Sequence, residues 1–344
     1  MSSSEAPSKG APRAAILGCA GLELTASERA FFRDADPLGF ILFLRNVFEP
    51  AQVRDLVASL RDAVGRSDAP VLIDQEGGRV ARLKPPHWPA YPAAAAMAEL
   101  PEKAAAEAVQ LSARLIAEDL HDLGITVDCL PVLDLRVAGA DAIIGDRSYG
   151  EDPKRVAALG RAACEGLLAG GVLPIVKHIP GHGRASVDSH FSLPRVATDR
   201  ATLEETDFAP FRLLAGMPWA MTAHIVYEAI DSARPATLSA SVISEAIRDS
   251  IGFDGLLLTD DLSMRALQGS FAERARDALA AGCDVVLHCN GDRAEMEQVI
   301  EGTGRLATAA LVRLARGEAL RRDGRKPFDR TTGSARLQDL MARV

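Results

Sequence analysis

The sequence predicts an α/β fold, a single-domain (β/α)₈ TIM-type barrel. Short apolar runs recur along the whole chain, and each is followed by a polar turn and a segment with helical periodicity. No Asn-Gly hairpin turn lies between these runs, so parallel strands are expected. Eight strand and helix units in 344 residues match the size of this barrel better than that of an open doubly wound sheet. The runs begin near Ala14, Gly39, Val71, Ile125, Leu173, Trp219, Leu256 and Asp284.

One helix between the strands has an apolar stripe that is suited to packing on a sheet. The stripe consists of Val109, Ala113, Ile116, Leu120 and Leu123. Glu118 and Asp119 belong to the same helix, and we expect both side chains to point outward.

No change of composition marks a second domain, so the barrel is expected to span residues 13–320. Residues 1–12, rich in Ser, Ala and Pro, are interpreted as an N-terminal tail. Residues 321–344 are interpreted as a C-terminal closing segment. Neither end is expected to contribute to the core.

Charge and cysteine content narrow the class of protein. The formal net charge is −8, which disfavours nucleic acid as a partner because nucleic-acid-binding proteins usually carry a basic face. Five cysteines without a CxxC pair fit neither a disulfide framework nor a zinc knuckle, so a reducing, cytoplasmic location is expected. No run approaches the roughly 20 apolar residues of a membrane span. The partner is therefore expected to be a small diffusing molecule, and a single barrel can act as a monomer.

Ionisable residues follow five of the predicted strands. In such a barrel the reactive groups lie at the carboxyl ends of the strands, where an ionisable side chain costs free energy unless it is paired or used. His224 and His288 could equally be satisfied histidines of the barrel wall, and we do not include them in the catalytic set. The strand-end residues are Asp74, Lys177, His178, His224, Asp260 and His288.

The segment from His178 to Pro194 is a long stretch without helical or strand periodicity, and such loops are usually functional. His178 and His182 are four residues apart, a spacing that could hold a metal on a helix. Pro180 and Gly181 prevent that helix, so no metal site is expected here.

Five ordered motifs at strand ends resemble those of the family three glycoside hydrolases, from about Ile16 to about Gly291. The likeness is to their single-domain bacterial N-acetyl-β-glucosaminidase branch, which removes GlcNAc from muropeptides during cell-wall recycling. The motifs are Ile73-Asp-Gln-Glu-Gly-Gly-Arg-Val80, Ile144-Gly-Asp-Arg-Ser-Tyr-Gly-Glu-Asp-Pro153, Lys177-His-Ile-Pro-Gly-His-Gly183, Asp188-Ser-His190 and Leu258-Thr-Asp-Asp-Leu-Ser-Met264.

The resemblance implies a role for individual residues. Asp260 corresponds to the nucleophile, and Asp261 is then a neighbour that caps or pairs. His190 corresponds to the proton donor, supported by Asp188. The implied sugar-binding residues are Asp74, Arg82, Arg147, Lys177 and His178, and no cofactor is implied. Ile179 departs from the family, which usually has Phe there; the exchange is apolar and affects shape more than chemistry.

Physical chemistry is consistent with these roles. Retaining glycoside cleavage needs a nucleophile at the anomeric carbon and an acid at the leaving oxygen. A histidine titrates near neutrality, and a carboxylate two residues earlier can orient it, as in a serine-protease triad. Asp260 must stay ionised, which Lys177 and Arg147 would favour.

Several alternatives stay open at the level of sequence. Asp74 could cap the Gly77-Gly78 turn, Arg147 could pair with Asp146 or Asp152 at the surface, and Asp260 could be a helix N-cap. A β-GlcNAc phosphorylase of the same fold is not excluded, because a histidine acid repels phosphate less than a glutamate does. A Schiff-base lyase using Lys177 and a non-catalytic sugar-binding barrel are the remaining classes.

Overall fold

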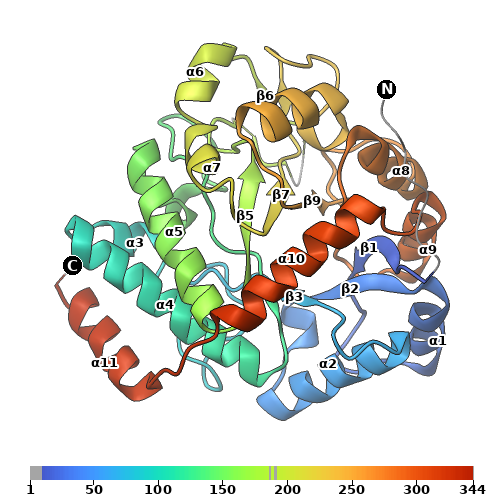
Figure 1. Ribbon diagram of the computed structural model, residues 1–344, viewed down its shortest axis with the longest axis horizontal. Coiled ribbons are helices and arrows are strands. Elements are labelled where there is room, and N and C mark those ends of the chain that lie inside the picture. Colours follow the sequence, from blue (N-terminus) through green and yellow to red (C-terminus); the bar gives the residue numbers. More distant parts are fainter. Residues whose placement is uncertain (1–9, 186, 190–191, 344) are drawn as a thin grey trace.

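A computed structural model describes residues 10–185, 187–189 and 192–343. Eight parallel strands close into a barrel in chain order, β1-β2-β3-β4-β5-β7-β9-β10, with β10 paired to β1 (Figure 1). All eight predicted strands and their parallel direction are thus confirmed. The barrel strands are β1 (Arg13–Leu17), β2 (Pro37–Leu42), β3 (Val71–Ile73), β4 (Val127–Asp128), β5 (Leu173–Ile179), β7 (Trp219–Thr222), β9 (Leu256–Asp261) and β10 (Val285–His288).

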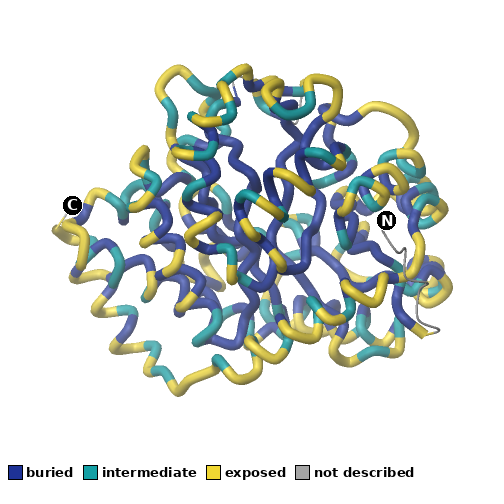
Figure 2. Tube along the Cα trace, turned by 45° about the horizontal axis from the view of Figure 1, so that its top comes forward, coloured by how far each residue is buried: buried dark blue, intermediate teal, exposed yellow. Residues whose placement is uncertain are grey.

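The strand side chains alternate between two apolar clusters, because successive residues of a strand point to opposite faces. Ile16, Leu72, Ile175 and Leu258 belong to the cluster inside the barrel, whereas Ile73 belongs to the cluster between strands and helices. Figure 2 shows the buried segments at the centre and the exposed ones on the helices and loops around them. This alternation decides which later residues of each strand reach the barrel mouth.

Helices cover the outside of the barrel, and one short sheet lies apart from it. Two strands that the sequence analysis missed, β6 (Arg195–Val196) and β8 (Val226–Tyr227), pair in parallel, and each is only two residues long. The helices are α1 (Ala26–Ala35), α2 (Pro50–Val64), α3 (Ala94–Ala98), α4 (Glu102–Asp122), α5 (Pro153–Ala169), α6 (Arg200–Glu205), α7 (Ala209–Leu213), α8 (Phe271–Ala281), α9 (Arg293–Gly302), α10 (Thr308–Gly324) and α11 (Arg330–Met341), with the 3₁₀ turns η1 (Leu44–Asn46), η2 (Gly145–Arg147) and η3 (Ala236–Leu238) and the π-helix η4 (Val242–Ser250).

The predicted outward direction of Glu118 on α4 is wrong. Glu118 is buried and forms an ion pair with Arg114, which lies one turn earlier on α4. Arg114 NH2 and Glu118 Oε1 are 2.8 Å apart. Asp119 is partly buried and accepts a hydrogen bond from the Tyr91 hydroxyl at 2.7 Å. The physical reason is a second layer: α11 lies beside α4 at the edge of the molecule and covers the face that would otherwise meet solvent (Figure 1).

The C-terminal region contributes to the core, contrary to expectation. Position 320 lies inside α10, whose Ala310 is buried with the barrel-interior residues Leu173 and Trp219 near the amino-terminal ends of the strands. In α11, Leu337 and Leu340 are buried in the outer cluster. Within the part of the chain that the structure describes, no helix combines the length and apolar composition needed to cross a membrane.

Candidate active site

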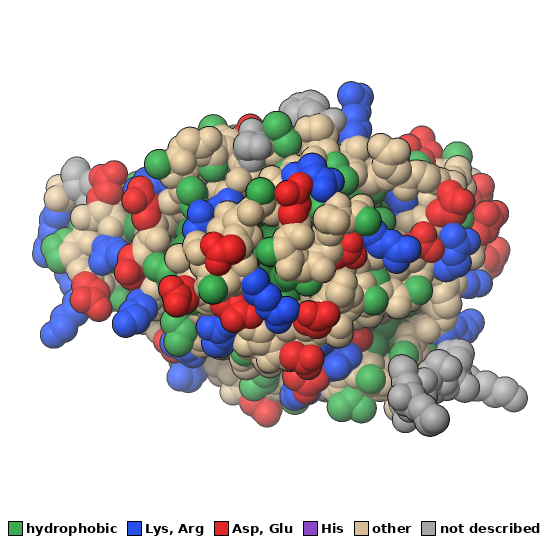
Figure 3. Space-filling model, turned by 90° about the horizontal axis from the view of Figure 1, so that it is seen from above, with side chains coloured by type: hydrophobic (Ala, Val, Ile, Leu, Met, Phe, Trp, Pro, Cys, Tyr) green, Lys and Arg blue, Asp and Glu red, His purple; other side chains and the backbone are tan. Residues whose placement is uncertain are grey.

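The strand alternation places polar residues at the barrel mouth. Asp74, Lys177 and Asp260 each follow an inward-facing apolar residue, Leu72, Ile175 or Leu258, by two positions. Since side chains two residues apart share a face, these three groups point inward at the carboxyl ends of their strands. Figure 3 views the molecule from above relative to Figure 1, and acidic and basic side chains are interspersed over the visible surface. The site therefore lies where the inward-facing positions of the strands continue beyond the apolar core and carry polar side chains instead of apolar ones.

A cavity of about 230 Å³ lies at this mouth and brings six predicted site residues together. It is smaller than the roughly 300–1,000 Å³ pockets of drug-sized ligands, and suits one sugar ring better than an extended chain. Apolar side chains complete its wall, among them Phe43, Ile143 and Met221. The predicted residues that line it are Asp74, Arg82, Arg147, Lys177, His178 and Asp260.

Lys177 and His178 both line the cavity although they are consecutive. A regular strand would send them to opposite faces. The pairing of β5 with β7 changes register between Lys177 and Ile179, and such an irregularity re-aims a side chain. The strand end is thereby able to contribute two adjacent residues to one site.

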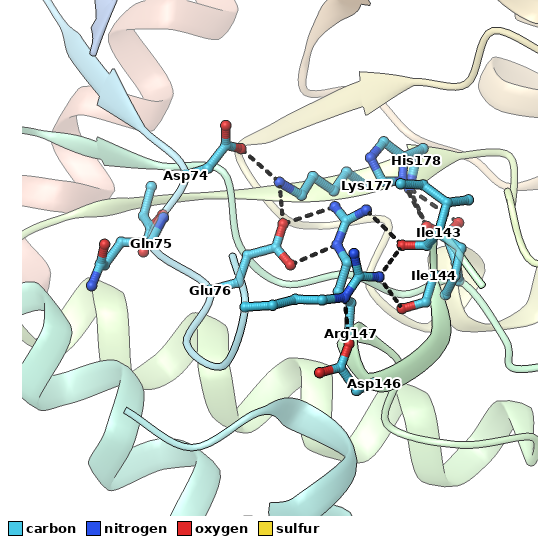
Figure 4. Close-up of polar contacts among 12 residues, drawn as sticks. Asp74, Gln75, Glu76, Ile143, Ile144, Asp146, Arg147, Lys177 and His178 are labelled. Atoms are coloured by element: carbon cyan, nitrogen blue, oxygen red, sulfur yellow. Dashed lines mark hydrogen bonds and ion pairs between the residues drawn. The ribbon is translucent and has the colours of Figure 1, made fainter. Parts of the chain in front are cut away.

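Lys177 lies between two carboxylates. Its Nζ is 2.9 Å from Asp74 Oδ1 and 2.7 Å from Glu76 Oε1 (Figure 4). Asp74 Oδ2 also accepts a hydrogen bond from Arg82 at 3.0 Å. Asp74 is thus paired with two cations, and the Gly78 amide donates to the Tyr91 carbonyl oxygen, so the contacts of Asp74 do not support its interpretation as a cap for the Gly77-Gly78 turn.

Arg147 is not paired at the surface with Asp146 or Asp152. Its Nε and NH2 groups donate to the two carboxylate oxygens of Glu76, each at 2.8 Å, in a bidentate pair (Figure 4). Asp146 instead accepts from Arg79 Nε at 2.7 Å. Glu76 therefore joins Arg147, on the loop after β4, to Lys177 on β5.

The charge states at the mouth follow from these pairs. Burial lowers the pKa of Lys177, but Asp74 and Glu76 outweigh it and raise that pKa above its usual value. Burial raises the pKa of Glu76, but Arg147 and Lys177 outweigh it and lower that pKa to about 2. A Schiff-base lysine must lose its proton to attack a carbonyl group, so this environment opposes the lyase alternative for Lys177.

Asp260 is held as a carboxylate. Burial raises its pKa, but His178, His224, the amide of Asp261 and Lys177 outweigh that effect and lower the pKa. The Asp261 N–H donates to Asp260 Oδ1 at 2.8 Å. Lys177 was predicted to lower the pKa of Asp260 and does so. Arg147 was also predicted to lower it, but is not among the main influences. Asp260 is the second-last residue of strand β9 and does not cap a helix.

Asp261 matches its predicted pairing role, and of the two histidines left open as satisfied wall residues only His224 has both ring nitrogens paired within the part of the chain that the structure describes. The Asp261 carboxylate accepts from the amides of Ser263 and Cys289, at 3.0 and 3.1 Å, so it fixes the backbone beside Asp260. His224 is buried, with Nδ1 2.7 Å from Thr237 Oγ1 and Nε2 3.0 Å from the Asp261 carbonyl oxygen. His288 is buried, with Nε2 2.9 Å from Glu295, but its buried Nδ1 has no hydrogen-bond partner among the described residues.

Two buried carboxylates of the site, Glu76 and Asp134, were missed from the sequence. Asp134 Oδ2 is 2.6 Å from His178 Nδ1, and its Oδ1 accepts from the His182 amide at 2.6 Å. Both had a detectable signal: Glu76 stands in the quoted Asp-Gln-Glu motif, and Asp134 interrupts an otherwise apolar stretch, Cys129–Leu135. A charged residue in such a stretch is buried only with partners.

The predicted proton donor, His190, lies outside the described residues. Its predicted partner Asp188 is described, and lies half-buried in the loop after β5. In residues 10–185, 187–189 and 192–343, no group of three or more His, Cys, Asp or Glu side chains is arranged to hold a metal ion.

Comparisons with known proteins agree with this geometry. A sequence profile described as the glycosyl hydrolase family 3 N terminal domain matches residues 19–316. The chain belongs to glycosyl hydrolase family 3. A β-hexosaminidase of Pseudomonas aeruginosa is 38% identical over 304 residues, which cover 88% of this chain and 89% of the relative.

Solved structures of family 3 members resemble the chain along nearly its whole length. NagZ from Neisseria gonorrhoeae, in complex with N-trifluoroacetyl-D-glucosamine, is 31% identical with a TM-score of 0.85, and the match covers 96% of this chain and 99% of that one. A family 3 β-N-acetylglucosaminidase from Paenibacillus sp. is 33% identical with a TM-score of 0.78. The match covers 96% of this chain but 61% of that longer protein.

Proposed function

We propose that this family 3 glycoside hydrolase is a retaining, exo-acting N-acetyl-β-D-glucosaminidase that removes terminal β-linked GlcNAc. The observation that carries the proposal is the position of Asp260, an ionised carboxylate in the same one-sugar cavity as Asp74, Arg82, Arg147, Lys177 and His178. Relatives named β-hexosaminidase and NagZ support the choice of sugar.

Each cavity residue has a proposed task. Asp260 attacks the anomeric carbon and forms the glycosyl-enzyme, which water then hydrolyses. Asp74 accepts hydrogen bonds from sugar hydroxyls, and Lys177, Arg82, Arg147 and His178 donate to sugar oxygens. The carboxylates that hold these donors fix their orientation before the sugar binds, which lowers the entropic cost of binding.

His190 is proposed as the proton donor to the leaving oxygen, with Asp188 orienting its ring. The same histidine would then activate the hydrolytic water, as microscopic reversibility requires. The support is the Asp188-Ser-His190 motif in the long loop after β5.

The wider setting is also a proposal. We infer that the substrates are muropeptides, GlcNAc linked to anhydro-MurNAc, in peptidoglycan recycling, and that the enzyme acts in the cytoplasm as a monomer. Five free, buried cysteines fit a reducing compartment. The small cavity accommodates the terminal sugar and leaves the remainder of a muropeptide outside.

The first test compares hydrolysis of an aryl N-acetyl-β-glucosaminide with that of the matching β-glucoside, in buffer and in millimolar phosphate. We expect selective release of free GlcNAc in both buffers. Appearance of GlcNAc 1-phosphate would identify a phosphorylase instead, and equal rates on the two glycosides would contradict the choice of sugar.

The second test concerns the proton donor. We expect His190→Ala to slow cleavage of a disaccharide by about 10²- to 10⁴-fold, the usual contribution of a general acid. A nitrophenyl leaving group departs without protonation, so its pre-steady-state glycosylation rate should fall much less. Equal losses on both substrates would mean that the proton donor lies elsewhere.

A further inference from the structure

The loop after β5 is fixed at its start by contacts from several directions. The Tyr227 hydroxyl donates to the Gly181 carbonyl oxygen at 2.6 Å, and Arg184 Nε donates to the buried Asp207 carboxylate at 2.7 Å. At Gly183 a Cβ atom would lie 2.0 Å from the Leu135 carbonyl oxygen, so only glycine allows this close approach. The loop therefore leaves the strand on a rigid base.

His182, on this base, has a side chain that the proposed reaction does not use. The residue is buried, and its ring lies 5.4 Å from the His178 ring in an edge-to-face arrangement. Its amide donates to Asp134, the same carboxylate that binds the His178 ring. Burial and the neighbouring His178 lower the pKa of His182 to about 4, so the ring is neutral near pH 7.

The His182 ring reaches across the loop to Ser189. His182 Nε2 is 3.2 Å from Ser189 Oγ, and both residues are buried. The Ser189 carbonyl oxygen also accepts a hydrogen bond from the Ala266 amide at 3.3 Å, in the segment after Asp260. The Ser189 side chain is thus bonded to His182, which lies beside the sugar-binding His178. The Ser189 backbone is bonded to Ala266, in the segment after the nucleophile Asp260.

Ser189 directly precedes His190 in the sequence. We propose that His182, acting through the Ser189 hydroxyl, is a positioning residue that sets the part of the loop carrying the proton donor relative to the sugar-binding His178. The hydrogen bond costs no desolvation of a charge because both partners are neutral, and it links the donor segment to Asp134 through a single residue, whose ring contacts Ser189 and whose amide donates to Asp134. This inference rests on the proposed function, in which His190 is the acid.

The test uses two single variants and their combination. Ser189→Ala removes the hydroxyl, and His182→Phe removes both ring nitrogens while keeping an aromatic ring against His178. Each single variant should slow glycosylation by a disaccharide about tenfold, a part of the roughly 10²- to 10⁴-fold contribution of the acid, and slow an activated nitrophenyl substrate much less. The double variant should lose little more than either single variant, because both remove the same contact.

Ser112→Ala is the matched control, since Ser112 is also buried but lies on α4, away from the cavity. It should leave both rates unchanged. Ser189→Thr keeps a hydroxyl and should restore the disaccharide rate of Ser189→Ala. Additive losses in the double variant, or equal losses on the two substrates, would overturn the positioning role.

A measurement without substrate separates this inference from the proposed function. Hydrogen–deuterium exchange over residues 184–192 should be faster in Ser189→Ala and in His182→Phe than in the unmodified protein and in Ser112→Ala. Unchanged exchange in both variants would show that this contact does not hold the loop. Absence of β-GlcNAc hydrolysis by the unmodified protein would instead overturn the proposed function, whatever the exchange rates are.

Discussion

Neighbouring charges decide the protonation of individual side chains at the barrel mouth. Asp128 and Glu76 are both buried acids, yet their pKa values move in opposite directions. Burial raises the pKa of Asp128 well above its usual value, and its one hydrogen bond from the Gln75 amide does not compensate. Glu76 has two cationic partners, and its pKa falls to about 2. For this pair, contact with cations and not depth of burial separates the ionised acid from the neutral one.

Asp260→Ala should abolish turnover of β-GlcNAc substrates while the protein remains folded, because this change removes the group that forms the glycosyl-enzyme. A 2-fluoro sugar should label Asp260, as mass spectrometry of the peptides can show. Because its pKa is lowered, Asp260 should impose no acid limb on the rate profile above pH 4. Labelling of Asp261, or of no carboxylate, would refute the nucleophile assignment.

Glu76→Gln should weaken substrate binding more than the chemical step, because Glu76 orients the proposed sugar-binding residues Arg147 and Lys177. We expect KM to rise and kcat to change less, with the loss measured by steady-state kinetics on an aryl β-GlcNAc. Asp146→Asn, which affects only the exposed partner of Arg79, is the control and should have a small effect. A fall in kcat at unchanged KM would contradict this division of roles.

At the scale of elements, strand ends supply chemistry and the last helix supplies packing. The β5 irregularity places two consecutive residues in the cavity, and the loop after β4 provides Arg147 through a charged contact to Glu76. No residue of helix α11 lines the cavity that contains Asp260, but α11 buries Leu337 and Leu340 against the outer core. The C-terminal closing segment is thus part of the folded unit.

Leu340→Ala should lower the free energy of unfolding by about 2–5 kcal/mol, the usual cost of a buried leucine-to-alanine change. Leu320→Ala makes the same chemical change on α10, where the side chain is 42% exposed, and should cost much less. Urea unfolding followed by circular dichroism gives both values. Similar losses for the two variants would mean that α11 does not pack on α4 as described.

At the scale of the whole molecule, the buried acids make stability depend on pH in two opposite ways. Asp74 and Glu76 have lowered pKa values, so the stability that they contribute is complete above their unfolded values of 3.8 and 4.5 and is lost as the pH falls through their folded values, which for Glu76 is about 2. Asp128 has a raised pKa, so its contribution is favourable at low pH and is lost as the pH rises above its unfolded value.

Asp128→Asn should therefore stabilise the protein increasingly as the pH rises from 4 to 7, because the amide cannot ionise. The free energy of unfolding should increase, relative to the unmodified protein, by at most about 1.4 kcal/mol per pH unit, which is the effect of one bound proton. Asp55→Asn, at an exposed position on α2, is the control. Chemical unfolding at several pH values measures the difference, and a gain that does not grow with pH would show that Asp128 is ionised in the folded protein.

Much of the architecture was predictable because it depends on local patterns. Apolar runs such as Val71–Ile73 and Leu256–Leu258 are bounded by polar turns, and their period and spacing lead to eight parallel strands. The two-residue strands β6 and β8 were missed, because so short a pairing leaves no periodic signal. The direction of Glu118 was missed, because the helix that covers it comes from more than 200 residues later.

Periodicity along the chain was sufficient to predict the barrel and the residues at the ends of its strands. Those residues include Asp74, Lys177 and Asp260. Which charged side chains pair with each other follows only from the folded structure. Glu76 pairs with Arg147, 71 positions away in the sequence, and Asp134 pairs with His178, 44 positions away. The physical reason is that charge state and orientation depend on distances across the barrel, which strand closure sets and which no local pattern records.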